Sequence, residues 1–208
     1  TTTSMSHAEY YPGAFFITTK LTFNPEDGTL YGAQCVGHEG VDKRIDQLAI
    51  IIKHKGTIYD LIRLEQAYAP PFSSAKDPIA IAGYTAANII SGKMPVIYWR
   101  DIDGLDRSKV QIIDTRTPSE FSLGTISGAV NIPVDDIRER MGEIDKSKPV
   151  VTFCAVGLRG YIAARILMAN GYEVRNLSGG YKTYQLATQD LQCADGNDDN
   201  DDSSCSCS

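Results

Sequence analysis

Two short apolar runs constrain the fold of this chain more than any other feature. Both "VQIID" (110–114) and "VVTFC" (150–154) are rich in β-branched residues, which is typical of strands buried on both faces of a parallel sheet. Helix-like segments follow them, and "AVNIP" (129–133) and "YEVRNL" (172–177) continue the alternation. Strands that alternate with helices in this way indicate a small α/β domain, which we place at residues 98–190.

The helices of this domain have recognisable start and stop signals. In "TPSEF", Thr117 suits an N-cap, Pro118 the first helical position and Glu120 the capping-box position. A second helix follows Cys154 and is expected to stop at Gly171. The spacing of that helix predicts one side formed by Ile162, Arg165, Ile166 and Ala169.

The first part of the chain predicts a different architecture. Segments 14–23 and 28–37 alternate like strands around the turn sequence "NPEDG". Helical patterns follow at 41–53, from Thr57 onward and at 78–92. The first pattern places on one face of its helix Ile45, Leu48, Ala49 and Ile52. The second begins with a capping pattern, Thr57 with Asp60 three residues on. We therefore expect an α+β domain, an antiparallel sheet with helices, over residues 8–92, and a boundary between residues 90 and 98.

Charge and hydropathy exclude several classes of protein. The net charge is −6, and residues 195–208 contain five Asp and no Lys or Arg, so the rest of the chain is close to neutral and offers no nucleic-acid surface. We expect 191–208 to be a disordered acidic tail. No apolar run approaches the roughly 18 residues of a membrane span. No glycine-rich nucleotide loop occurs, so no cofactor is expected to bind this segment.

The five cysteines are Cys35, Cys154, Cys193, Cys205 and Cys207. An odd number without a secretory signal indicates reduced thiols and predicts a cytoplasmic protein. The C-S-C pair near the end has residues that bind metal or relay sulfur, but no second pair lies nearby, so plain disorder is the favoured interpretation and we assign no metal site.

The sequence around Cys154 favours chemistry at its sulfur. The cysteine closes a buried strand, and a helix begins within a few residues, so unpaired N–H groups should converge near the thiol and favour the thiolate. Arg159 adds a positive charge, and Gly157 permits backbone geometry that a side chain would obstruct. The loop would comprise the residues Ala155, Val156, Gly157, Leu158, Arg159 and Gly160.

Three interpretations of Cys154 compete. It is a small buried hydrophobe, the nucleophile of a cysteine phosphatase, or a carrier of sulfur. A phosphatase loop follows C-x5-R, whereas Cys154 and Arg159 form C-x4-R with one residue fewer. The shorter loop closes more tightly, which suits one sulfur atom better than a tetrahedral phosphate. The spacing therefore favours the sulfur carrier.

Several motifs in this half resemble a rhodanese domain. The matching segments are "VQIIDTRTPSEFSLGTISGAVNIPVDD", "VVTFCAVGLRGYIAARIL" and "YEVRNLSGGYKTY". The resemblance implies that Cys154 is the catalytic residue and accepts sulfane sulfur as a persulfide. It also implies a supporting role for Asp114 and Arg116 in a D-x-R motif. Thr125 stands where many rhodaneses have a histidine, so any contribution of that histidine is missing here.

The first half resembles the dimerisation domain of CoA-disulfide and CoA-persulfide reductases, on "EYYPGA", "VGHEGVDKRIDQLA" and "AYAPPFSSAKDP". These are FAD-dependent pyridine nucleotide-disulfide oxidoreductases, whose NADH oxidases are similar here. The resemblance implies a homodimer through residues 8–92. It also implies that Tyr10 or Tyr11, and Tyr68, reach the thiol site of the partner subunit, although pattern alone makes them packing residues.

Together these resemblances imply the C-terminal third of a larger reductase that uses FAD, NAD(P)H and CoA. We expect a sulfurtransferase module that is loaded by polysulfide, persulfide or thiosulfate and unloaded by a thiol such as CoA. The alternative is a non-catalytic dimerisation and docking module of a flavin-dependent NADH oxidase or disulfide reductase.

Overall fold

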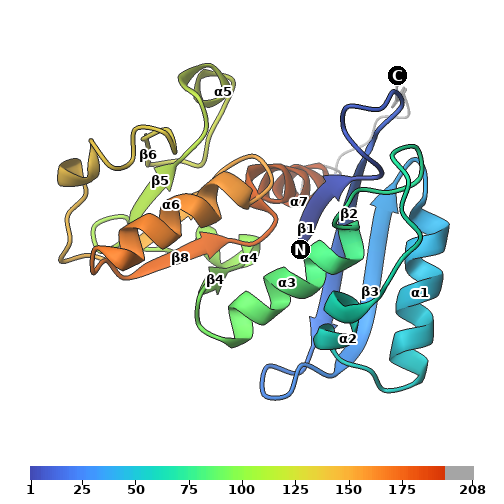
Figure 1. The fold of residues 1–208 in the computed structure, drawn as a ribbon. Helices are drawn as coiled ribbons and strands as arrows, with labels where there is room; N and C mark the ends of the chain where they lie inside the picture. The colour runs from blue at the N-terminus through green and yellow to red at the C-terminus, as the bar shows by residue number, and fades with distance from the viewer. Residues whose placement is uncertain (195–208) are drawn as a thin grey trace.

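The computed structural model describes residues 1–194 and shows two separate sheets (Figure 1). The first sheet is antiparallel, in the order β1 (Thr2–Met5), β2 (Phe16–Phe23) and β3 (Leu30–Gly37). The predicted hairpin is confirmed. Strand β1 was not predicted, because four polar or small residues before Met5 give no hydrophobic alternation.

Three helices complete the first unit: α1 (Val41–Lys53), α2 (Ile58–Arg63) and α3 (Pro78–Ile90). The capping box at Thr57 is present, and Asp77 caps α3 by accepting a hydrogen bond from the Ile79 N–H at 3.1 Å. Their apolar side chains form one core with the sheet, made by Leu30, Leu48, Ile58, Leu61, Ile79 and Ala86.

The buried face of α1 differs in part from the prediction. Leu48 is fully buried and Ile45 and Ile52 pack against the core, but Ala49 is exposed. Arg44, which is not among the predicted residues of this face, is buried with 1% exposure. A pattern of hydrophobic residues cannot predict this, because a buried arginine depends on a partner elsewhere in the chain.

The second sheet is parallel throughout, in the order β4-β8-β7-β5-β6. Its strands are β4 (Val96–Ile97), β5 (Gln111–Asp114), β6 (Ala129–Asn131), β7 (Val150–Phe153) and β8 (Val174–Leu177). The helical elements are α4 (Trp99–Ile102), α5 (Pro118–Ser122), the 3-10 helix η1 (Met141–Glu143), α6 (Leu158–Ala169) and α7 (Gly180–Ala194). This is the α/β domain that the sequence predicts.

Both faces of this sheet are covered, as the unbroken apolar runs predict. Ile113 and Val150 belong to one core with α6, whereas their neighbours Ile112 and Val151 belong to a second core on the other face. Such alternation places one side of each strand in each core.

Helix α6 packs against the sheet with the side opposite to the row that the spacing predicts. Its buried residues are Gly160, Ala163, Ala164 and Leu167, whereas Ile162 is 41% exposed, Arg165 and Ala169 are exposed, and Ile166 is half-buried. Small residues allow the helix to lie close to the sheet: a Cβ at Gly160 would come within 3.0 Å of the Phe153 Cα.

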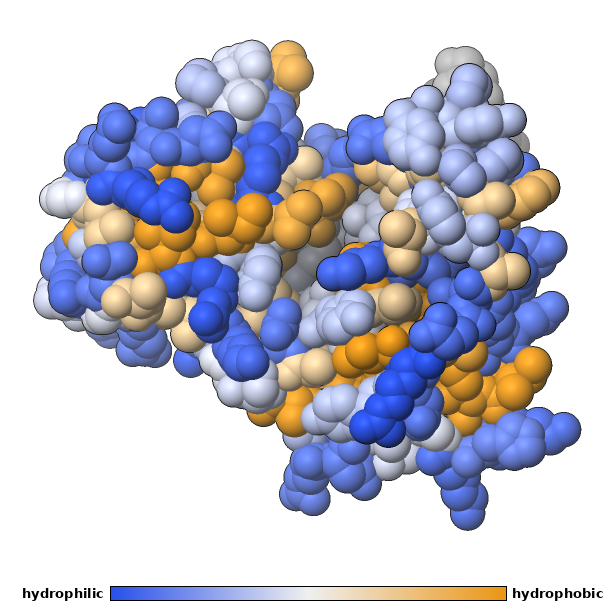
Figure 2. Space-filling model, in the orientation of Figure 1, coloured by the Kyte–Doolittle hydropathy of each residue, from blue (hydrophilic) through white to orange (hydrophobic). Residues whose placement is uncertain are grey.

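The two units meet along a hollow that is visible between the halves of the molecule (Figure 2). This interdomain cavity of about 520 Å³ is lined by β1 and α3 on one side and by the start of α6 and the end of β8 on the other. The Asn88 amide in α3 donates to the Tyr161 hydroxyl in α6 at 3.4 Å, so the contact also includes hydrogen bonding.

The remaining expectations concern the chain ends and the membrane. Helix α7 runs to Ala194, into the segment predicted as a tail, and residues 195–208, with Cys205 and Cys207, lie outside the described residues. Among the described residues, every helix is too short or too polar to cross a bilayer.

Candidate active site at the end of strand β7

Cys154 lies where β7 ends and α6 begins, as the sequence predicts. It directly follows Phe153, its side chain is 1% exposed, and α6 starts at Leu158. Gly157 adopts φ +113°, and its N–H donates to the Cys154 Sγ at 3.1 Å. A backbone N–H at a helix start that points to sulfur stabilises negative charge there. The positive φ explains why this position is glycine.

The loop is also held from behind by the first turn of α7. The N–H of Tyr181 donates to the Cys154 carbonyl at 2.8 Å, and the N–H of Lys182 donates to the Ala155 carbonyl at 3.0 Å. Gly180 makes this approach possible, because a Cβ there would lie 2.5 Å from the Cys154 carbonyl oxygen. This support could not be predicted, because the pair "GG" at 179–180 before a helix is its only local signal in the sequence.

Neighbouring polar side chains fix the remaining loop residues. The Asn176 amide donates to the Gly157 carbonyl at 3.1 Å, and the Thr152 hydroxyl donates to the Gly160 carbonyl at 3.0 Å. Ala155 and Val156 are half-buried, whereas Leu158 is 65% exposed. Val156, Gly157 and Leu158 line the interdomain cavity, so this side of the loop faces the first domain.

Arg159 connects the cysteine loop to α5. Its two terminal nitrogens donate to the two carboxylate oxygens of Glu120, at 2.7 and 2.6 Å. This ion pair raises the pKa of Arg159, with a smaller contribution from the nearby Cys154 thiol, and lowers the pKa of Glu120 to about 2. The sequence placed Glu120 only in a capping box, and the structure adds its contact with the loop arginine.

The D-x-R pair lies beside the site and is buried. Arg116 donates through Nε and Nη2 to both oxygens of Asp114, with a shortest distance of 2.6 Å, and Nη2 also donates to the Gly124 carbonyl at 2.7 Å. The guanidinium lies 4.4 Å from the centre of the Tyr181 ring. The Thr125 hydroxyl donates to Asp114 at 2.9 Å, so the residue that replaces the histidine has a defined contact. These contacts are those of a structural group.

The three tyrosines lie on loops of the first domain. Tyr10, Tyr11 and Tyr68 are 77%, 43% and 52% exposed. The neighbouring Tyr10 side chain raises the pKa of Tyr68. Exposed tyrosines are available to contact a second subunit.

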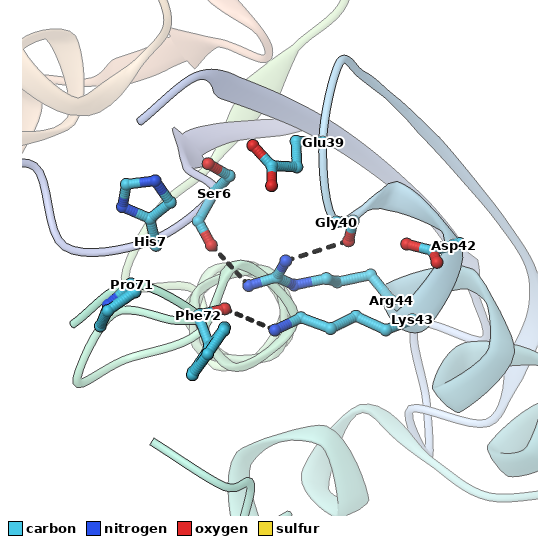
Figure 3. A pocket seen from close by; sticks show the side chains of 9 residues that line it. All are labelled: Ser6, His7, Glu39, Gly40, Asp42, Lys43, Arg44, Pro71 and Phe72. Carbon is cyan, nitrogen blue, oxygen red and sulfur yellow. Dashed lines mark hydrogen bonds between the residues drawn. The ribbon is translucent and has the colours of Figure 1, made fainter. Parts of the chain in front are cut away.

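A buried arginine fixes the loops that carry these tyrosines. Arg44 donates to the Ser6 carbonyl at 2.7 Å and to the Gly40 carbonyl at 3.0 Å, as Figure 3 shows, and it pairs with Asp77 at 2.6 Å. It lies at the side of a pocket of about 270 Å³ that His7 and Phe72 also line. The arginine thus joins three segments that are distant in sequence.

The described residues contain no cluster of three or more His, Cys, Asp or Glu that could hold a metal ion. Cys35, the other thiol described, is half-buried, and burial raises its pKa. Cys154 is therefore distinguished from Cys35 by its loop and by the N–H that contacts its sulfur.

Comparison with known families matches each half of the chain separately. Residues 102–187 match the rhodanese-like domain, and residues 1–80 match the dimerisation domain of pyridine nucleotide-disulphide oxidoreductases. Among curated proteins, the coenzyme A disulfide reductase of Staphylococcus epidermidis is 42% identical over 81 residues, which are 39% of this chain and 18% of that protein.

Two solved structures contain both halves. Reduced Bacillus anthracis CoADR-RHD matches with a TM-score of 0.88 and 44% identity, over 91% of this chain and 34% of that one. A NAD-dependent persulfide reductase from A. fulgidus matches with a TM-score of 0.76 and 36% identity, over 86% of this chain and 32% of that one. The chain thus spans about a third of the length of these two structures.

Proposed function

We propose that this chain carries sulfur on Cys154. The chain joins a pyridine nucleotide-disulphide oxidoreductase dimerisation domain to a rhodanese-like domain. It also matches the C-terminal part of CoADR-RHD and persulfide reductase structures. The observation that carries this proposal is the Gly157 N–H, 3.1 Å from the Cys154 Sγ at the start of α6. The whole reductase would add FAD and NAD(P)H from parts that precede this segment.

The reaction needs no oxidant. The Cys154 thiolate attacks the sulfane sulfur of a donor such as thiosulfate, an S–S bond forms on Cys154, and the donor S–S bond breaks. Sulfite leaves with the electron pair of the broken bond. An acceptor thiolate, for example that of CoA, then attacks the outer sulfur and displaces the Cys154 thiolate. The N–H of Gly157 stabilises the charge on the Cys154 sulfur before and after transfer.

The first domain would serve this chemistry by pairing two chains. Its exposed tyrosines, Tyr10, Tyr11 and Tyr68, would contact the thiol site of the partner's flavin domain. Sulfur delivered by Cys154 could then be reduced to sulfide at that site with electrons from NAD(P)H.

Loading with thiosulfate followed by mass spectrometry of the intact chain tests the proposal. We expect one added sulfur, located on Cys154 by peptide mapping and absent from Cys154→Ser. Cys35→Ser is the matched control and should load like the wild type. The absence of an adduct would refute the proposal and favour the non-catalytic docking module. An adduct that persists in Cys154→Ser would refute the assignment of the carried sulfur to Cys154.

A further inference from the structure

We propose that Glu120 sets the charge preference of the sulfur donor by occupying the one cation of the cysteine loop. The inference rests on the proposed sulfur transfer at Cys154. Between Cys154 and Gly160, Arg159 is the only charged residue. Its guanidinium is the group to which an anionic donor near Cys154 would bind, and Glu120 already holds it.

Glu120 binds Arg159 with the same geometry by which an arginine binds an oxyanion. Two parallel hydrogen bonds of 2.7 and 2.6 Å join the guanidinium to the carboxylate, which is the arrangement that arginine also forms with phosphate. A sulfonate group presents similar oxygens. An oxyanion that binds Arg159 must therefore displace the carboxylate or accept its repulsion at short range.

Glu120 is also fixed from its other side. The Thr117 N–H and hydroxyl donate to Glu120 Oε2 at 3.0 and 2.9 Å, within the capping box of α5. The side chains of Arg159 and Glu120 are 32% and 34% exposed, so the pair stands at the surface, where a donor can approach. Arg116, a second arginine beside the site, is buried and held by Asp114 and the Gly124 carbonyl. It therefore offers no substitute.

Two donors that differ by one charge test this inference. Thiosulfate is a dianion that releases sulfite, and benzenethiosulfonate is a monoanion that releases benzenesulfinate; both transfer the same sulfane sulfur to the Cys154 thiolate. The glutamine in Glu120→Gln keeps the capping box. Removing one charge roughly 6 Å from the donor, at the dielectric of water, should raise kcat/KM about ten-fold for thiosulfate and about three-fold for benzenethiosulfonate.

The control is Asp145→Asn, which removes a carboxylate charge at the opposite end of the strands from Cys154. Asp145 lies next to the start of β5, where its carbonyl accepts from Gln111 at 2.8 Å, and asparagine can still accept from the Ser147 N–H. This variant should leave kcat/KM for both donors unchanged. The wild type gives a second test, because salt screens repulsion and should raise the rate of thiosulfate relative to benzenethiosulfonate.

The outcomes separate the two proposals. Equal changes for both donors in Glu120→Gln, or a wild-type donor ratio that does not respond to salt, would overturn the role of Glu120 and leave sulfur transfer intact. Failure of the wild type to load from either donor would overturn sulfur transfer itself, and the role of Glu120 with it. A larger gain for the dianion in the variant supports both.

Discussion

Replacing Gly180 with alanine should separate α7 from the cysteine loop. The new Cβ would lie 2.5 Å from the Cys154 carbonyl oxygen and 2.7 Å from that of Ala155, closer than real contacts allow, and both are backbone atoms. Two hydrogen bonds, from Tyr181 and Lys182, must then lengthen or break, at about 1 kcal/mol each. The positive φ of +65° adds about 1 kcal/mol. We expect the free energy of unfolding to fall by about 3 kcal/mol.

Gly128→Ala is the matched control, because it separates the strain of a positive φ from the clash. Gly128 has φ +77°, but its new Cβ would meet only the Arg107 side chain at 3.6 Å, an ordinary contact. This variant should lose about 1 kcal/mol. Urea unfolding followed by the fluorescence of Trp99, the single tryptophan, measures both variants in the same domain.

Persulfide loading should slow in Gly180→Ala and keep its wild-type rate in Gly128→Ala. Equal losses of stability in the two variants would refute the view that α7 holds the loop through a close backbone contact. So would a Gly180→Ala variant that loads Cys154 at the wild-type rate.

Three further predictions concern the ion pairs and the cap. Arg44→Met should destabilise the first domain by about 3–5 kcal/mol in urea titrations, because it leaves Asp77 buried without its partner; a loss below about 1 kcal/mol would contradict this. The folded-state pKa of Glu120, about 2, lies below its ordinary value of 4.5. The pair with Arg159 therefore stabilises the folded protein fully above pH 4.5, and this stabilisation is lost as the pH falls toward 2. The advantage of wild type over Glu120→Gln, under about 1 kcal/mol at this exposed site, should shrink over that range, and a constant difference would contradict the assignment. Thr117→Ala should cost about 1 kcal/mol by thermal melting through loss of the α5 cap, and no change would show that the cap is dispensable.

The sequence predicts the features of this fold that depend on local chemistry. The apolar runs at β5 and β7 and the capping signals at Thr57 and Thr117 all form the elements expected of them. The position of Cys154 before α6 follows for the same reason, because a strand end, a glycine and a helix start are each visible within a few residues.

Features that depend on contacts between distant segments could not be predicted in this way. The buried face of α6 follows the need for small residues against the sheet, which outweighs the larger side chain of Ile162. Arg44 is buried because Asp77 lies opposite, 33 positions away. The pairing of Glu120 with Arg159 joins segments 39 positions apart, so a single sequence shows the two charges without their contact.

Transfer of the outer sulfur from Cys154 to a thiol tests the central claim most directly. The chain is loaded with thiosulfate labelled at its sulfane sulfur, freed from excess donor, and mixed with CoA in a single turnover. We predict that the label leaves Cys154 and appears as CoA persulfide, with the unmodified thiol restored on the protein. Label that stays on the protein, or transfer that proceeds equally with Cys154→Ser, would contradict the claim that this cysteine carries sulfur.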